Sequence, residues 1–289
     1  MNGNSQFFKQ AVEKAIQDLP AIPRVAQSII AQTSDPDTSI QDIEKLIKSD
    51  QAITSKLLRV VNSAYYGLPG KVSNISQACL MLGTQQIRAL VLSLTLFSSL
   101  NLETNQQKIS MQKFWLHSLT SVSCVNIIGQ KRKMSSVDLG FLQVCTLLHD
   151  MGRLLLFTSF PQLYDQSILK ITKTKESIAK TEMEMWGLTH AEIGCRMAEV
   201  WKLPARICAV IGQHEGIFRE ETDWEAFPIH IADSICQFIY IDQTQPYIVQ
   251  LENQALLWLN YQEEEIKSLR ETCQQKLIEF CEGDGLEAA

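Results

Sequence analysis

The sequence predicts an all-α protein, and three observations lead to that fold class. Apolar residues recur at helical spacing along most of the 289-residue chain. Residues that cap helix N-termini, such as Ser, Thr and Asp, precede several of these apolar runs. Polar segments rich in Gly, Pro or Asn separate the runs, as loops between helices do. Hydrophobic residues make up 45% and charged residues 20% of the chain, which is typical of a globular protein.

The first helices are predicted between residues 38 and 61. Thr38 and Gln41 form a capping box, and the apolar residues after them share one helical face. A second helix is expected to start near Asp50, because the apolar residues of "SDQAITSKLLRVV" again follow a helical period. Residues 62–70, "NSAYYGLPG", then form a loop, since Asn, Gly and Pro interrupt regular structure.

The next two predicted helices meet at Gly83. Ser73 can cap a helix that ends near this glycine, and Thr84 can cap the helix that follows. Residues 90–97 alternate apolar and polar side chains in part, as a strand would. The same apolar residues also fit one helical face, and both flanks are helical, so we expect a helix there.

The polar segment "LNLETNQQKIS" is the first gap long enough to separate two domains, and helices are predicted on both sides of it. Thr189 and Glu192 form another capping box, Pro204 starts a further helix that Gly216 closes, and Pro228 opens the next. The final "EGDGLEAA" is expected to be disordered. The remaining predicted helices span residues 111–129, 137–158 and 161–171, with one or two amphipathic helices in 247–281.

Charge and cysteine usage limit the classes of function. The net charge of −6 and the pI near 5.5 disfavour a general nucleic-acid-binding surface. The eight cysteines form no C-x-x-C pair, so we interpret them as buried free thiols in a reducing cytoplasm rather than zinc ligands or disulfides. The N-terminus lacks a signal-peptide pattern, and the longest apolar run, residues 89–100, is too short to span a bilayer. We therefore expect a cytoplasmic protein that binds neither nucleic acid directly nor membranes.

The most informative stretch is "LLHDMGRLLL", which places His149, Asp150 and Arg153 in an apolar run. A buried charge needs a partner, and the sequence allows two kinds. His149 and Asp150 can converge on one divalent metal ion at the flank of a helix, because imidazole and carboxylate groups suit transition metals. Alternatively, Asp150 pairs with Arg153 three residues later, and His149 bonds to a backbone carbonyl.

Several motifs resemble known families. His117, the "HD" of "LLHDMGRL" and the later Ala232-Asp233 resemble the HD superfamily of metal-dependent phosphohydrolases. The segments "LPAIPRVAQSII", "LLRVVNSAYYG", "QACLMLGTQQIRALVL" and "THAEIGCRMAEVWKLPARICAVIGQHE" resemble the HDOD domain, a bacterial signalling output module. The resemblance covers about residues 12–240.

The resemblance implies an N-terminal helical bundle packed on an HD-domain-like helical bundle. On this basis residues 1–105 form the N-terminal subdomain and residues 106–245 the HD-like subdomain, and residues 246–289 add C-terminal helices and a tail. Most HDOD proteins have lost the HD ligands and look like regulatory or protein-interaction modules.

This chain retains residues at the ligand positions of the HD enzymes. By the resemblance, His117, His149, Asp150 and Asp233 match the four positions that bind one metal ion, which would be Mn, Fe, Zn or Mg. The resemblance also matches His190 and His214 to two histidines that serve a second metal in the related HD-GYP cyclic-dinucleotide phosphodiesterases.

The departures from those patterns are equally specific. Arg153 stands where the HD motif usually has a lysine, and Gln213 replaces the first histidine of a tandem pair. Lys113 stands where the phosphodiesterases place a glutamate ligand, and the glycine-tyrosine-proline loop is absent. A lysine beside the pocket would repel a second cation, so a two-metal phosphodiesterase is disfavoured.

Three functional hypotheses follow. We favour a signal-transduction module that acts through regulatory or protein contacts without catalysis, and its loop "NSAYYGLPGKVSN" is either a surface for a signalling protein or a plain connector. The alternative is a single-metal phosphohydrolase of a nucleotide or phosphoester, with Arg153 on the phosphate and His190 or His214 as acid or base. A third is a module that binds a cyclic dinucleotide without hydrolysis, which no residue specifies.

Overall fold

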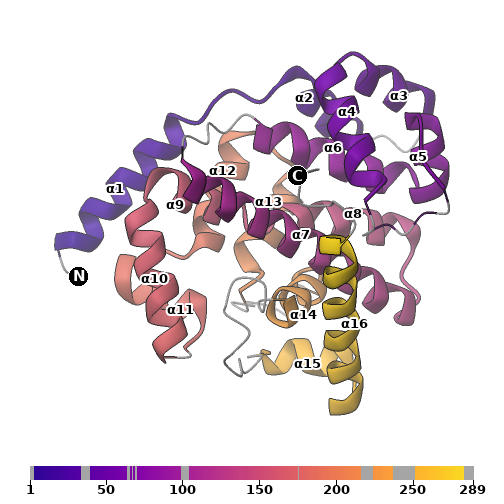
Figure 1. The fold of residues 1–289 in the computed structure, drawn as a ribbon. Helices are drawn as coiled ribbons and strands as arrows, with labels where there is room; N and C mark the ends of the chain where they lie inside the picture. Colours follow the sequence, from indigo (N-terminus) through magenta and orange to yellow (C-terminus); the bar gives the residue numbers. More distant parts are fainter. Residues whose placement is uncertain are drawn as a thin grey trace.

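The fold was analysed in a computed structural model, which describes residues 3–33, 40–63, 66, 68, 70–98, 104–174, 176–215, 224–236 and 251–282. Within these residues the secondary structure is helical and contains no strand, which confirms the predicted all-α class (Figure 1). The helices are α1 (Gly3–Gln17), α2 (Arg24–Thr33), α3 (Ile40–Lys48), α4 (Gln51–Val61), α5 (Ile75–Leu82), α6 (Thr84–Ser98), α7 (Asn105–Lys131), α8 (Ser136–Leu148), α9 (Met151–Ser159), α10 (Pro161–Thr174), α11 (Ile178–Trp186), α12 (His190–Val200), α13 (Ala205–Gln213), α14 (Ala226–Cys236), α15 (Asn253–Leu259) and α16 (Glu263–Glu282).

Helices α2 to α6 form a bundle around α6. Helices α2, α4 and α5 all pack against α6, and its side chains are buried from Ile87 to Phe97 on every face. This explains the mixed pattern of residues 90–97, because a helix that is covered all round has no polar side. The small hydroxyls of Ser93 and Thr95 bond to carbonyls one turn back, which satisfies them inside the core.

The second bundle is built on α7, the long helix at the centre of Figure 1. Helices α8, α9 and α14 pack on α7, and α12 packs on both α9 and α13. The contact of α6 with α8 joins the two bundles. Helix α1 lies away from α2–α6 and packs on α9, α11 and α12 instead, where Phe8 contacts the rings of Phe160 and Trp186. The proposed subdomain limits at residues 105 and 245 stay a prediction.

Two C-terminal helices cover one side of the second bundle. The predicted amphipathic region is resolved into α15 and α16, and α16 packs on α7 and α14. Its apolar stripe faces inward, since Leu269 and Cys273 are buried and Ile266 and Leu277 pack against the core. The final "EGDGLEAA" starts at Glu282, and residues 283–289 lie outside the described part of the chain.

Most predicted helix starts are correct to within a few residues. The capping box of Thr189 is present, with both reciprocal bonds to Glu192, and Asp50 caps α4. Gly83 ends α5 at a φ of +84°, a conformation that favours glycine. Pro204 directly precedes α13 as predicted.

Other predicted boundaries were wrong or fall on undescribed residues. Asn74, not Ser73, caps α5, because its side chain accepts the Gln77 backbone N–H. Helix α6 begins at Thr84 itself, and α14 begins two residues before Pro228. Helix α7 begins at Asn105, earlier than predicted, because Thr104 provides a full capping box. Both Thr38 and Gly216 lie outside the described residues.

The predicted single helix over 137–158 was also wrong, because the chain turns at His149 and Asp150. The α8 helix ends at Leu148 and α9 starts at Met151, and the Arg153 N–H bonds to the Asp150 carbonyl only three residues back. A hydrogen bond of the 3₁₀ type, between residues three apart, replaces the regular α-helical hydrogen bond at this point. The 24-residue stretch 136–159 is apolar enough to cross a membrane by composition, but 89% of its most apolar window is buried inside the fold. It therefore forms the protein core.

The loop after α4 is held at its base by Asn62. Its side-chain amide donates to the carbonyls of Leu58 and Val72, and its oxygen accepts the Val72 N–H. Tyr66 is half-buried against the core, while Lys71 is exposed. The described part of this loop therefore behaves mainly as a connector, and Ala64, Tyr65, Gly67 and Pro69 lie outside the described residues.

Candidate metal centre

Three helix segments bring His117, His149, Asp150 and Asp233 together. His117 lies in the middle of α7, Asp233 on α14, and the adjacent pair at the α8–α9 turn. The four side chains are buried, and their candidate ligand atoms all lie within 4.8 Å of one another. The turn after Leu148 makes this possible, because it frees the two adjacent side chains from the 100° separation that a continuous helix would impose.

Helix α14 can lie close to His117 because the side chains on this face of α7 are small. Ser121 and Cys124 follow His117 at one-turn intervals, and both are fully buried. Helix α14 packs along this part of α7 and carries Asp233 to the imidazole. The neighbouring helix α14 therefore packs on this face of small residues.

The two histidines of this quartet are oriented so that both Nε2 atoms face the same point. His117 Nδ1 lies 3.3 Å from the Cys236 carbonyl, and His149 Nδ1 lies 2.6 Å from the Thr146 carbonyl. An Nδ1–H that donates to a carbonyl leaves the lone pair on Nε2, which is the usual arrangement of a metal-bound histidine. The two Nε2 atoms are 3.1 Å apart, and Asp233 Oδ1 lies 3.0 Å from that of His117.

That spacing fits a shared cation. Two imidazoles bound to one ion at about 2.0–2.1 Å place their nitrogens about 2.9–3.4 Å apart, depending on the coordination geometry. Lone pairs that face each other at 3.1 Å repel unless a proton or a metal ion lies between them. The mixed nitrogen and oxygen donors suit a divalent transition metal, so the residues fit such an ion.

The charged groups in and around the quartet shift one another's pKa values. Burial alone would lower the pKa of His149, but Asp150 and Asp233 outweigh it and the pKa is raised above 6.5. Burial would raise the pKa of Asp150, but Arg153 and His149 outweigh it and hold that pKa well below 3.8. The pKa of Asp233 is also held well below its usual value, since the hydrogen bonds of His117 and His149 outweigh its burial. Both carboxylates are therefore anionic and available to a cation.

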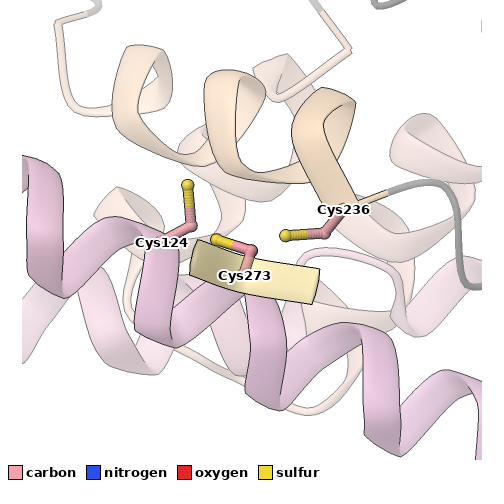
Figure 2. Close-up of side chains that lie close together, drawn as sticks. All are labelled: Cys124, Cys236 and Cys273. Atoms are coloured by element: carbon pink, nitrogen blue, oxygen red, sulfur yellow. The ribbon is translucent and has the colours of Figure 1, made fainter. Parts of the chain in front are cut away.

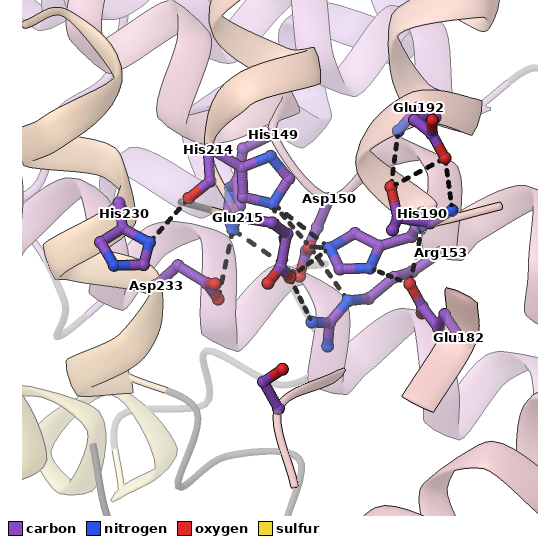
Figure 3. A network of polar contacts seen from close by, with 12 residues as sticks. His149, Asp150, Arg153, Glu182, His190, Glu192, His214, Glu215, His230 and Asp233 are labelled. Carbon is purple, nitrogen blue, oxygen red and sulfur yellow. Dashed lines mark hydrogen bonds and ion pairs between the residues drawn. The ribbon is translucent and has the colours of Figure 1, made fainter. Parts of the chain in front are cut away.

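Asp150 divides its two oxygens between two clusters (Figure 3). Its Oδ2 faces the quartet, at 3.5 Å from His117 and 3.6 Å from His149. Its Oδ1 faces the other way, at 3.2 Å from His190 Nε2 and 3.7 Å from His214 Nε2. The structure therefore brings all six predicted histidine and aspartate residues into one continuous network.

Arg153 belongs to the second cluster. Its guanidinium is 1% exposed, and its Nε lies 3.0 Å from Asp150 Oδ1 and its terminal nitrogen 3.8 Å from Glu215. The ion pair considered as an alternative to a metal is thus present, but it uses only one carboxylate oxygen. The same aspartate can therefore pair with Arg153 and still present Oδ2 to an ion in the quartet.

Two glutamates of the network were not anticipated as site residues. Glu182 on α11 accepts the His190 backbone N–H at 2.8 Å and lies 2.7 Å from its Nδ1. Glu215 lies 2.9 Å from His190 Nε2. A signal for Glu182 did exist, because it lies one turn from both Ile178 and Trp186 on the buried face of its helix.

Lys113 does not act as the sequence suggested, and His230 has a structural role. Lys113 is exposed, so the argument that its charge repels a second cation was wrong, and Arg153 provides the buried positive charge instead. His230 is buried, its Nδ1 lies 2.9 Å from the His214 carbonyl, and its Nε2 accepts the Glu252 N–H. It therefore connects α14 to the start of α15.

Comparison with known proteins identifies the family. The family model of the HDOD domain matches residues 19–217, which is more than half of the chain. The chain belongs to the HDOD family. A curated relative of this HDOD protein, an uncharacterized protein of Treponema pallidum (strain Nichols), is 23% identical over 268 residues. That match covers 91% of this chain and 50% of the relative, so the chain spans about half the length of the curated relative it matches.

Solved structures share the fold at low sequence identity. An HDOD domain protein of unknown function from Geobacter sulfurreducens is 18% identical with a TM-score of 0.70, and the match covers 98% of both chains. A Marinobacter aquaeolei VT8 protein, whose name proposes signal transduction, is 15% identical with a TM-score of 0.74 over 99% of this chain and 67% of its own. A Shewanella amazonensis SB2B protein, whose name proposes a metal-dependent phosphohydrolase, is 17% identical with a TM-score of 0.61 over 96% of this chain and all of its own.

Proposed function

We propose that this HDOD protein is a non-catalytic regulatory module of signal transduction that binds one divalent metal ion in its HD-like half. The observation that carries the proposal is burial. His117, His149, Asp150 and Asp233 are at most 1% exposed, as is the neighbouring Arg153. An ion can enter such a site during folding or local opening, whereas a phosphoester must reach both the ion and a water molecule. A closed ligand set therefore suits a structural or sensing ion.

The quartet would hold the ion, and the ion would supply positive charge to two buried carboxylates. Its ligands come from α7, from the α8–α9 turn and from α14, so binding would join segments more than 100 residues apart in sequence. Because the unfolded chain has no such site, binding free energy adds to folding stability. Mn²⁺, Fe²⁺ and Zn²⁺ suit the mixed nitrogen and oxygen donors better than Mg²⁺, which prefers oxygen ligands.

Helix α8 would connect the metal site to the surface of the protein. It ends at Leu148, next to the candidate ligand His149, and begins at Ser136, beside a cavity of about 390 Å³ that lies between α8 and the α5–α6 junction. Val137, which lines this cavity, is 68% exposed. We propose that a signalling protein binds here, because an exposed apolar side chain beside a cavity is typical of protein interfaces. The free cysteines agree with a reducing cytoplasm.

The first experiment is metal analysis by inductively coupled plasma mass spectrometry on untagged protein. We expect about one transition-metal ion per chain in the wild type and loss of that ion in His149→Ala and Asp150→Ala. The matched control is His230→Gln, which alters a buried histidine of the same region that is not a member of the quartet. Metal-loaded protein should show no phosphatase or phosphodiesterase turnover. Turnover that disappears with His149→Ala would refute the non-catalytic assignment.

A single-metal phosphohydrolase is the second candidate, and one observation favours it. The Arg153 guanidinium lies beside the candidate ligand Asp150, where it could bind a phosphate after local opening. In that case His190 or His214 would transfer a proton, and Arg153→Lys would lower the turnover of a chromogenic phosphoester without loss of the metal. Absence of turnover with Mn²⁺, Fe²⁺ and Zn²⁺ would exclude this candidate. Binding of a cyclic dinucleotide is disfavoured by the same burial.

A further inference from the structure

Three cysteines from three helices meet in the second bundle. Cys124 lies on α7, Cys236 ends α14 and Cys273 lies on α16. Their sulfurs lie within 4.8 Å of one another, and all three side chains are fully buried. Figure 2 shows the three side chains close together, each on a different helix. These residues are separated by more than 35 positions in sequence, so only the tertiary fold brings them together.

This convergence is not a general property of the buried cysteines. Cys79, Cys145 and Cys208 are buried too, but none of them belongs to a metal-compatible cluster among the described residues. Free cysteines usually fill a core as small apolar groups, one at a time. Three sulfurs at one point are instead the donor set of a soft metal ion.

The geometry points to a second metal site: we propose that Cys124, Cys236 and Cys273 bind one thiophilic ion, Zn²⁺ or Cu(I), separate from the histidine and aspartate quartet. Thiolate–metal bonds of about 2.3 Å place three sulfurs about 3.8–4.0 Å apart around a shared ion. The sulfurs already lie within 4.8 Å, so inward movements of less than about 1 Å would complete the site. A disulfide would require one pair to approach to about 2.05 Å and would leave the third thiol out.

Binding exchanges protons for the ion. Each of the three S–H groups releases its proton to solvent, and the three sulfur lone pairs coordinate the ion without any change in oxidation state. Cu(I) is satisfied by soft sulfur donors, whereas Zn²⁺ usually adds a fourth ligand such as water. Both ions share the requirement for the three thiolates, and a metal titration distinguishes them.

The site would act on the same helix end that carries Asp233. Cys236 lies three residues after Asp233 on α14, and its carbonyl faces His117 Nδ1 at 3.3 Å. An ion held by Cys236 and Cys273 would join the end of α14 to α16. It would also fix the carbonyl that orients His117.

The test is titration of metal-free wild-type protein with Co²⁺, a spectroscopic substitute for Zn²⁺. Thiolate ligands give an intense sulfur-to-cobalt charge-transfer band in the near ultraviolet, which histidine and carboxylate ligands do not give. We expect this band to saturate at about one ion per site, to disappear in Cys273→Ser, and to persist in Cys208→Ser, the matched control. It should also persist in Asp150→Ala, so failure of the quartet and failure of the thiolate site are distinguishable.

Competition identifies the natural ion. Displacement of Co²⁺ by Zn²⁺, or by Cu(I) under anaerobic reducing conditions, should abolish the band, and X-ray absorption should show sulfur neighbours at about 2.3 Å. No charge-transfer band in the wild type would overturn the proposal, and so would a band that survives in Cys273→Ser. If Cys273→Ser fails to fold by circular dichroism, Cys124→Ser and the sulfur shell in wild-type X-ray absorption provide the same decision.

Discussion

At Gly152 the backbone of α9 lies directly against the backbone of α12, and Gly152→Ala tests that contact. A Cβ at this position would lie 2.8 Å from the Gly194 nitrogen and 2.9 Å from the His190 carbonyl carbon, and closer still to the His190 carbonyl oxygen. Ordinary contacts of a Cβ begin at 3.4 Å. All three obstacles are backbone atoms, so no side chain can rotate away, and α9 has to separate from α12.

The expected cost follows from that geometry. Overpacking of a core typically costs about 1–3 kcal/mol, and a clash with backbone belongs at the upper end, so we expect about 3 kcal/mol. For a chain of this size each kcal/mol changes Tm by about 2 °C, so the Tm should fall by about 6 °C. The separation of α9 from α12 also moves Asp150 from His190, and metal affinity should fall with stability.

The assay is thermal and urea unfolding of metal-free wild type, Gly152→Ala and Gly212→Ala. Gly212 is the control because its Cβ would lie 3.3 Å from the Cys195 Cβ and 3.4 Å from its sulfur, a small crowding by a side chain. Alanine gains up to about 1 kcal/mol over glycine inside a helix, so Gly212→Ala should leave stability unchanged or slightly higher. A Gly152→Ala protein as stable as wild type would refute the packing of α9 on α12.

Three further predictions concern the charges of the site. Chelation of the bound metal should lower the free energy of unfolding by about 2.7 kcal/mol for free metal at 100 times its Kd, and His149→Ala should show no such change in calorimetry. The pKa values of His149 and His190 are raised, so their stabilisation of metal-free protein is full below pH 6.5 and is lost as pH rises through the folded-state values. The depressed pKa of Asp150 acts in the opposite direction, with stability lost below pH 3.8, so urea midpoints should peak between these limits. Because protons compete with the metal ion for the histidine nitrogens, metal affinity should rise as pH increases above 6.5. A metal affinity that does not change with pH would contradict the raised histidine pKa values. Glu182→Gln should cost about 1.5–3 kcal/mol of stability, because a buried charged hydrogen bond to His190 is replaced by a neutral one, and equal urea midpoints would exclude that pairing.

Local sequence was sufficient to predict most of the helices. Capping residues act within three positions, so they can be recognised from the sequence alone. Asp50 and Thr189 were predicted correctly, and the cap at Asn74 was misplaced by one residue. The four quartet residues could be grouped because the resemblance to HD enzymes supplied positions that are far apart in sequence. Their common location then appeared in the structure, while their role as ligands stays a prediction.

The features that were missed depend on contacts between distant segments. The turn at His149 and Asp150 was hidden because residues 137–158 are mostly apolar on both sides of it, and the close approach of Gly152 to α12 that accompanies the turn depends on a distant segment. The three clustered cysteines follow no short spacing, so no pattern could join them. Lys113 was placed in the site by analogy, but its own helix directs it to solvent.

The charge of the network explains why one metal ion suits it better than two. Four buried carboxylates are present, on Asp150, Glu182, Glu215 and Asp233, against the single permanent cation of Arg153. His190 has a carboxylate at each ring nitrogen, Glu182 at 2.7 Å and Glu215 at 2.9 Å, which is the environment of an imidazolium with two donors. With His149 neutral, as a metal ligand must be, two positive charges against four negative ones leave a deficit of two, which one divalent ion in the quartet would neutralise. A second ion would require His190 to lose its proton and Arg153 to leave Asp150, so in the proposed one-metal site the arginine would supply the positive charge that a second metal would otherwise provide.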